Sequence, residues 1–194
     1  MLYVSLIVFL LSLAYSPGPG NMFFAAVGAQ SGFGGSWQAS AGYHLATFVV
    51  TALTVMGFET VARLSPEAFR LLGIGGAIYM LWLAGKSLMA GALQAGTKRV
   101  VPSFRNGVVL LVLNPKAHVI ITLMFSQFLP EGAGLPWVLV VTTIFTLNNF
   151  VAFTVWTKLG QVLSQVFRAE RQARLLNGIF AAALTLTAVH GLAT

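Results

Sequence analysis

Two proline-containing motifs interrupt long apolar segments of the sequence. Ser16-Pro17-Gly18-Pro19-Gly20 lies in the first apolar segment, and Asn114-Pro115-Lys116 lies in a later one. Because proline has no amide hydrogen and its ring clashes with the carbonyl one turn earlier, each motif is expected to break its helix. Carbonyl groups freed in hydrocarbon cost several kcal/mol each, so they should line a protein cavity. By helical register, these carbonyls belong to residues near Leu13, Tyr15 and Leu111.

Beyond each break, a second half-helix is predicted to begin near the middle of the membrane. Ser16 and Asn114 are the expected N-caps, with Pro17 and Pro115 at the first helical position, where proline is favoured. A helix start presents unpaired N–H groups and a partial positive charge, which suit a carboxylate. Lys116 adds a full charge in the first turn. The motifs therefore predict an anion pocket, and simple proline kinks satisfied by Ser or Thr side chains are the alternative.

A carboxylate receptor beside free carbonyl groups is what a zwitterionic amino acid requires, because carbonyls accept hydrogen bonds from an ammonium group. Asn114 and Lys116 are the leading candidates. Asn21, Gln127, Asn148 and Asn149 are supplementary, since such residues in membrane helices more often bond neighbouring helices. The predicted substrate-binding residues are Ser16, Pro17, Gly18, Pro19, Asn21, Asn114, Pro115 and Lys116.

Transport driven by an ion gradient usually needs a titratable group on the pathway, and two histidines are candidates. His44 lies in the second apolar segment, and His118 lies one turn after Asn114. Imidazole exchanges protons near physiological pH, so either residue is a candidate proton carrier. The alternative for both is a hydrogen-bonded packing residue.

The composition of the 194-residue chain is that of an integral membrane protein. Hydrophobic residues make up 57% of it and charged residues 8%, against about 25% charged in soluble domains. Apolar runs of ~20 residues without two-residue alternation predict helices, so the expected fold is all-α. Six transmembrane helices are predicted, at Leu2–Val27, Gln38–Thr60, Phe69–Gly91, Asn106–Leu129, Leu135–Thr157 and Leu175–Leu192.

The distribution of basic residues predicts the orientation in the bilayer. The connections after spans one, three and five are the more basic, and the positive-inside rule makes them cytoplasmic. Both termini are then expected on the non-cytoplasmic side. Between spans five and six, Leu163 and Phe167 share one helix face, which indicates a cytoplasmic interfacial helix or, alternatively, a solvated basic loop. The basic residues of these connections are Lys98, Arg99, Arg105, Lys158, Arg168, Arg171 and Arg174.

An internal repeat is predicted from two parallels between the halves of the chain. Arg70-Leu71-Leu72-Gly73 opens the third span, and Arg174-Leu175-Leu176-Asn177-Gly178 opens the sixth. The broken first and fourth spans form the second parallel. Three spans per half give the halves opposite orientations, the inverted-repeat plan of many secondary transporters. We therefore expect one membrane domain, residues 1–194, built from three-helix repeats at 1–97 and 98–194.

At the two proline motifs and at further positions given below, the chain resembles the LysE/RhtB family of amino-acid exporters over nearly its whole length. The resemblance implies a bacterial inner-membrane carrier that exports amino acids or related metabolites with the proton-motive force, and it suggests a homo-oligomer. Pro17, Gly18, Pro19 and the Asn114-Pro115-Lys116 motif match the family pattern, whereas Ser16 replaces a common Thr and Ser126 a common Pro. The remaining matches are Gly32-x-Gly34-Gly35, Ser65-Pro66, Gly76-Ala77-Ile78-Tyr79-Met80, Gly85, Phe104-x-x-Gly107, Leu113 and Gln127-Phe128.

Composition also excludes or disfavours other functions. The chain has no cysteine, which excludes disulfides, dithiol relays and thiolate metal sites, and no aspartate, which disfavours a metal exporter. No cofactor or metal is expected, and no enzyme active site is evident. The net charge of +7 is attributed to membrane topology rather than to nucleic-acid binding. The lack of a midmembrane carboxylate favours a small neutral substrate, and the alternatives are an exporter of another solute or a structural membrane protein.

Overall fold

All regular secondary structure in the described part of the chain is α-helical, as predicted. The computed structural model describes residues 2–16, 18–56, 101–128, 130 and 133–166, together with helical positions at 71, 74–75, 78, 81–82, 85, 175, 178–179, 181–183, 185–186 and 189. The predicted third and sixth spans fall largely outside these residues. The two Arg-Leu-Leu segments of the predicted repeat do so as well.

The first broken segment consists of α1 (Leu2–Tyr15) and α2 (Pro19–Gly35), whose axes differ by 60°. The predicted first span ended at Val27, but α2 continues to Gly35. A kink at Gly32, where φ is +72°, redirects its last turn. The kink leaves the amide of Phe33 without a helical acceptor, and this amide donates to Oε1 of Gln161 at 2.8 Å.

The second broken segment consists of α6 (Phe104–Val112) and α7 (Pro115–Phe128), whose axes differ by 62°. Its limits agree with the predicted fourth span to within two residues. The start of α6 is capped by Asn106, whose side-chain oxygen accepts from the amide of Ser103 at 2.9 Å. The bends of 60° and 62° at the two breaks are thus nearly equal.

Two long helices pack against the broken segments. They are α3 (Trp37–Met56) and α8 (Leu135–Val166). The predicted fifth span ended at Thr157, but α8 continues for nine more residues and reaches about 48 Å, well beyond a ~30 Å hydrocarbon core. Leu163 thus belongs to α8 and not to a separate interfacial helix, while Phe167 and the arginines after it lie outside the described residues.

Glycines set the two closest helix contacts. A Cβ on Gly28 of α2 would meet the carbonyl of Thr157, and one on Gly160 of α8 would meet the carbonyl of Ala25. In the same way, Gly42 of α3 faces the backbone of Phe104. Close approach through small residues is typical of membrane helices, which gain no hydrophobic energy from association in lipid. The α2–α8 and α3–α6 pairs are therefore closely packed frames for the two breaks.

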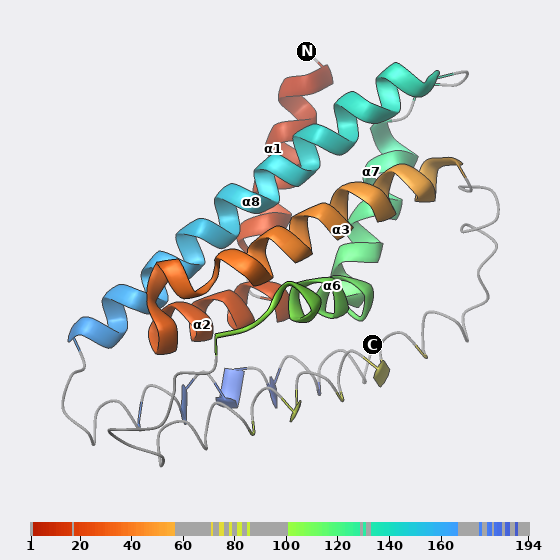
Figure 1. Ribbon diagram of the computed structural model, residues 1–194. Coiled ribbons are helices and arrows are strands. Elements are labelled where there is room, and N and C mark those ends of the chain that lie inside the picture. The colour runs from red at the N-terminus through yellow and green to blue at the C-terminus, as the bar shows by residue number, and fades with distance from the viewer. Residues whose placement is uncertain are drawn as a thin grey trace.

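The arrangement of the helices brings the two breaks together. In Figure 1, α1 and α7 extend upward from the breaks, and α2 and α6 lie below them. Contacts join α1 with α7 and α2 with α6, so the bent segments lie side by side. Because α1 ends at its break and α7 begins at its own, these two half-helices run in opposite directions.

Large apolar side chains cover the outside of the helices, as expected for a protein surrounded by lipid. Val4, Leu53 and Val166 are each more than half exposed. By length and composition, α8 is the one unbroken membrane-spanning helix in the described residues, and the two bent pairs raise the number of spans to three if each pair crosses once.

Candidate functional site

The carbonyl end of α1 is satisfied by polar side chains. Ser16 Oγ donates to the carbonyl of Leu13 at 2.8 Å, and Asn21 Nδ2 donates to the carbonyl of Ala14 at 2.8 Å. The carbonyl of Leu13, one of the groups expected to be freed by the break, is therefore bonded by a serine hydroxyl, and Leu13 lines the cavity described below. At the second break, the carbonyl of Leu111 accepts from the backbone amide of Asn114 at 3.0 Å.

The start of α2 differs from the prediction by two residues. Ser16 is not its N-cap: Gly18 holds that position, with φ −171° and ψ 176°, and Pro19 is the first helical residue. The physical reason is that a residue before proline is forced into an extended conformation, so Pro19 prevents Gly18 from being helical. Pro17 lies outside the described residues.

The start of α7 agrees with the prediction. Pro115 is its first residue, and the backbone carbonyl of Asn114 accepts from the amides of Ala117 and His118 at 3.0 and 3.4 Å, as an N-cap carbonyl does. The Asn114 side chain is buried, and its Nδ2 donates to the hydroxyl of Tyr43 at 3.2 Å. Its Oδ1 has no hydrogen-bond partner among the described residues. Asn114 therefore offers a buried, unused acceptor.

Lys116 connects the two breaks. Its ammonium donates to the carbonyl of Ser16 at 2.6 Å and to Ser16 Oγ at 2.9 Å, across 100 residues of sequence. The lysine stem lies against the N-cap of α2, since a Cβ on Gly18 would be 2.7 Å from Lys116 Cδ. Lys116 was predicted to add charge to the start of its own helix, but in this conformation its charge lies at the carbonyl end of α1.

A small cavity lies where the breaks meet. Its volume is about 10 Å³, which is the space that one water molecule needs. It brings together the predicted residues Asn21, Asn114 and Lys116, which come from α2 and from the second break. Ser16 and Gly18 join the group through their contacts with Lys116. The lining residues are Leu13, Ala14, Asn21, Tyr43, Asn114, Lys116, Ala117, Ile120, Asn149 and Phe153.

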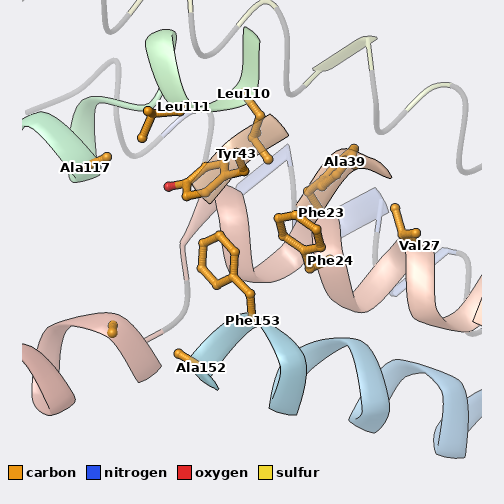
Figure 2. Packing of buried hydrophobic residues seen from close by; sticks show 11 residues of the cluster. Phe23, Phe24, Val27, Ala39, Tyr43, Leu110, Leu111, Ala117, Ala152 and Phe153 are labelled. Atoms are coloured by element: carbon orange, nitrogen blue, oxygen red, sulfur yellow. The ribbon is translucent and has the colours of Figure 1, made fainter. Parts of the chain in front are cut away.

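Aromatic side chains form the wall of this cavity that faces α3 and α8. Tyr43 and Phe153 have ring centroids 4.8 Å apart, and Phe24 packs against both rings. Figure 2 shows the hydroxyl of Tyr43 pointing toward Ala117 at the start of α7. Neither Tyr43 nor Phe153 was predicted from the sequence, where an aromatic residue in an apolar helix carries no distinguishing signal.

His44 lies one layer behind this wall. It is buried, and its Nδ1 donates to the carbonyl of Ser40 at 2.7 Å, so Nδ1 carries a proton. Its Nε2 has no hydrogen-bond partner among the described residues. Ser40 and Phe150, which contact His44, line a second cavity of about 250 Å³ at the α2–α3 turn. His44 thus lies between the two cavities.

The other predicted residues lie farther from the cavity or have other partners. His118 is half-buried and is not among the residues that line it; its Nε2 donates to the carbonyl of Val112 at 2.9 Å, a group exposed by the break before Pro115. Of the supplementary candidates, Asn149 lines the cavity, whereas Gln127 and Asn148 do not.

Over nearly its whole length, the chain is similar to known membrane transport proteins. The LysE type translocator family matches residues 11–193. Cysteine/O-acetylserine efflux proteins of Escherichia coli (strain K12) and Shigella flexneri are each 28% identical to the chain over 178 residues, covering 91% of this chain and 90% of theirs. No solved structure matches the chain. Members of the matching family are transporters and not enzymes. The chain belongs to the LysE type translocator family.

Proposed function

We propose that the protein exports a small neutral amino acid, or a related metabolite, across the bacterial inner membrane. The observation that carries the proposal is the meeting of two broken helices around one cavity lined by Asn21, Asn114 and Lys116. Support also comes from the relatives, which are named for efflux of cysteine and O-acetylserine. The cavity holds about one water, so substrate entry requires the half-helices to move apart.

The proposed site binds the substrate through both of its charged groups. The starts of α2 and α7 place positive helix ends near the cavity, which favours the carboxylate there. The carbonyl end of α1 and the unused Oδ1 of Asn114 provide acceptors for the ammonium group. An α-amino acid, which carries a carboxylate and an ammonium on one carbon, fits this pair of opposite ends.

The cavity lining favours a neutral side chain. None of the described residues that line the cavity is acidic, and the whole chain contains four glutamates and no aspartate. A lysine or arginine substrate would bring a second positive charge next to Lys116 without a carboxylate to balance it. Burial of such an unpaired charge is costly. Serine, cysteine and O-acetylserine avoid that cost.

We propose the proton-motive force as the energy source, with His44 as the leading proton carrier. The hydrogen bond to Ser40 fixes the neutral tautomer and leaves Nε2 as the acceptor of a second proton. Rings of Phe24, Phe150 and Phe153 pack around the imidazole and separate it from lipid. His118 remains the second candidate.

Export from cells loaded with a panel of dipeptides tests the proposal. Intracellular hydrolysis supplies each amino acid, and its appearance outside is compared between cells with the protein and cells with an empty vector. We expect faster export of small neutral amino acids only, and loss of that gain in an Asn114→Ala, Lys116→Ala variant at equal membrane abundance. The Lys158→Ala variant is the control, because Lys158 lies near Phe33 and away from the cavity. Export equal to the empty vector for the whole panel would contradict the proposal and favour a structural role.

A further inference from the structure

Lys116 holds the place at which the proposed substrate would put its ammonium group. Its Nζ lies 2.6 Å from the carbonyl oxygen of Ser16 and 2.9 Å from its hydroxyl, at the negative end of α1. The carbonyls of Leu13 and Ala14 are satisfied by neutral donors from Ser16 and Asn21. Of the donors in these contacts, only Lys116 is charged and comes from the other break.

The lysine stem also covers the start of α2, which faces the carbonyl end of α1 across the site. A Cβ on Gly18 would lie 2.7 Å from Cδ and 3.0 Å from Nζ of Lys116, so the stem passes directly over the N-cap of α2. This is the positive helix end that we assign to the substrate carboxylate. Lys116 in this position therefore blocks both halves of the proposed site, consistent with the small volume left beside it.

The cavity beside Lys116 also contains a hydrogen-bond acceptor that has no donor in the part of the chain that the structure describes. Oδ1 of Asn114 is without a hydrogen-bond partner among the described residues, although the side chain is only 4% exposed. Asn114 and Lys116 line the same cavity. A buried acceptor without a partner is unfavourable and marks a place where a ligand group can donate.

We propose that Lys116 is an internal substitute for the substrate ammonium. When substrate enters, its ammonium takes over the carbonyl of Ser16 and the Oδ1 of Asn114, and Lys116 withdraws from the carbonyl end of α1. When substrate leaves, Lys116 returns to Ser16 and allows the two breaks to close without it. This inference rests on the proposed function, because it assumes that an amino acid binds between the breaks.

Two modes of transport, net efflux and exchange, should depend on Lys116 to different degrees. Net efflux requires the carrier to return without substrate, a step in which Lys116 must satisfy the end of α1. Exchange of internal for external substrate omits that step, because substrate supplies the ammonium in both directions. Loss of the Lys116 charge should therefore impair net efflux far more than exchange.

The test uses the full-length protein in proteoliposomes loaded with radiolabelled O-acetyl-L-serine in a mildly acidic buffer, where the ester is stable. Efflux is measured into buffer without substrate and into buffer with unlabelled O-acetyl-L-serine. We expect Lys116→Met to reduce net efflux by about tenfold or more, which is the effect of one lost charged hydrogen bond, and to reduce exchange much less. The matched control, Lys158→Met, should alter neither mode.

A second variant reaches the same contact without removing the charge. Gly18→Ala pushes a methyl group onto the lysine stem, and we expect net efflux to fall more than exchange. A parallel loss of both modes in Lys116→Met and Gly18→Ala would overturn the inference in favour of a fixed ligand or structural role, and unchanged net efflux in Lys116→Met would also overturn it. Failure of the unmodified protein in both modes would instead overturn the proposed function, together with the inference that depends on it.

Discussion

Polar side chains at the breaks replace the hydrogen bonds that proline removes. Each unsatisfied buried group costs about 1–3 kcal/mol, and charged donors contribute more than neutral ones. Ser16 and Asn21 each bond a different carbonyl near the end of α1, and Lys116 bonds the carbonyl of Ser16 itself. The chain thus satisfies the backbone of a non-helical segment from within the protein, as a segment surrounded by lipid would require.

Which residues gather at the breaks was predictable, but their pairing was not. Asn114 and Lys116 follow from the motif itself, because a proline at the first helical position fixes its neighbours in the first turn. That Lys116 crosses to Ser16 depends on how α1 and α7 pack, which is a long-range property. The same holds for Tyr43, which reaches Asn114 from α3.

The two histidines give a prediction about proton coupling. His44→Gln keeps a polar side chain but removes the group that takes a second proton. We therefore expect that an outside-acid pH gradient no longer accelerates export by this variant. His118→Gln should retain that dependence, because His118 already bonds the carbonyl of Val112 and does not line the cavity. Export at a series of imposed pH gradients checks both variants. The reverse pattern would assign the proton to His118 instead.

Among the structural elements, sequence predicts the breaks best and the ends of the helices least well. The bends of 60° and 62° arise at proline motifs that are visible in the sequence. By contrast, α8 extends nine residues past its predicted end, because Gly160 packs against α2 and Gln161 bonds the kinked turn at Phe33. Such contacts between helices stabilise turns that hydropathy alone does not include.

The contact between α2 and α8 is predicted to depend on Gly160. A methyl group there would meet the carbonyl of Ala25, so Gly160→Ala should force the helices apart and destabilise the protein by about 1–3 kcal/mol. Gly34→Ala is the matched control, because a Cβ at Gly34 has no neighbour within 4 Å among the described residues. Thermal unfolding in detergent measures both variants, and equal melting temperatures would show that the close contact contributes little.

The second break is predicted to serve transport more than folding. Pro115→Ala permits a continuous helix, which would pair the first-turn amides of α7 with carbonyls of α6 and withdraw them from the site. We expect export to fall severalfold while membrane abundance changes little, since alanine favours helix by about 3 kcal/mol over proline in a helix interior. Export normalised to abundance on immunoblots checks this. Full export at normal abundance would mean that the break is not part of the mechanism.

On the scale of the whole molecule, the breaks, the glycine contacts and the apolar exterior describe a membrane protein with its polar groups directed inward. The all-α class, the membrane location and the transporter class were correct expectations from composition, motifs and resemblance. Composition indicates the helical class and the membrane location, because it reflects what surrounds the protein. The motifs and the resemblance indicate the transporter class. The inverted repeat of residues 1–97 and 98–194, and the position of both termini outside, stay predictions. They depend on spans that lie largely beyond the described residues.

If an amino acid binds where the two breaks meet, it should protect a single cysteine placed there from a thiol reagent. The chain has no cysteine of its own, so Ala117→Cys places one thiol in the cavity and Ser36→Cys places one in the separate cavity at the α2–α3 turn. The rate of modification by a small methanethiosulfonate reagent is measured in membranes with and without O-acetyl-L-serine. If the amino acid binds at the breaks, it should slow modification at Ala117→Cys severalfold and leave the rate at Ser36→Cys unchanged. Equal rates with and without amino acid at Ala117→Cys, in a variant that still exports, would contradict binding at the breaks.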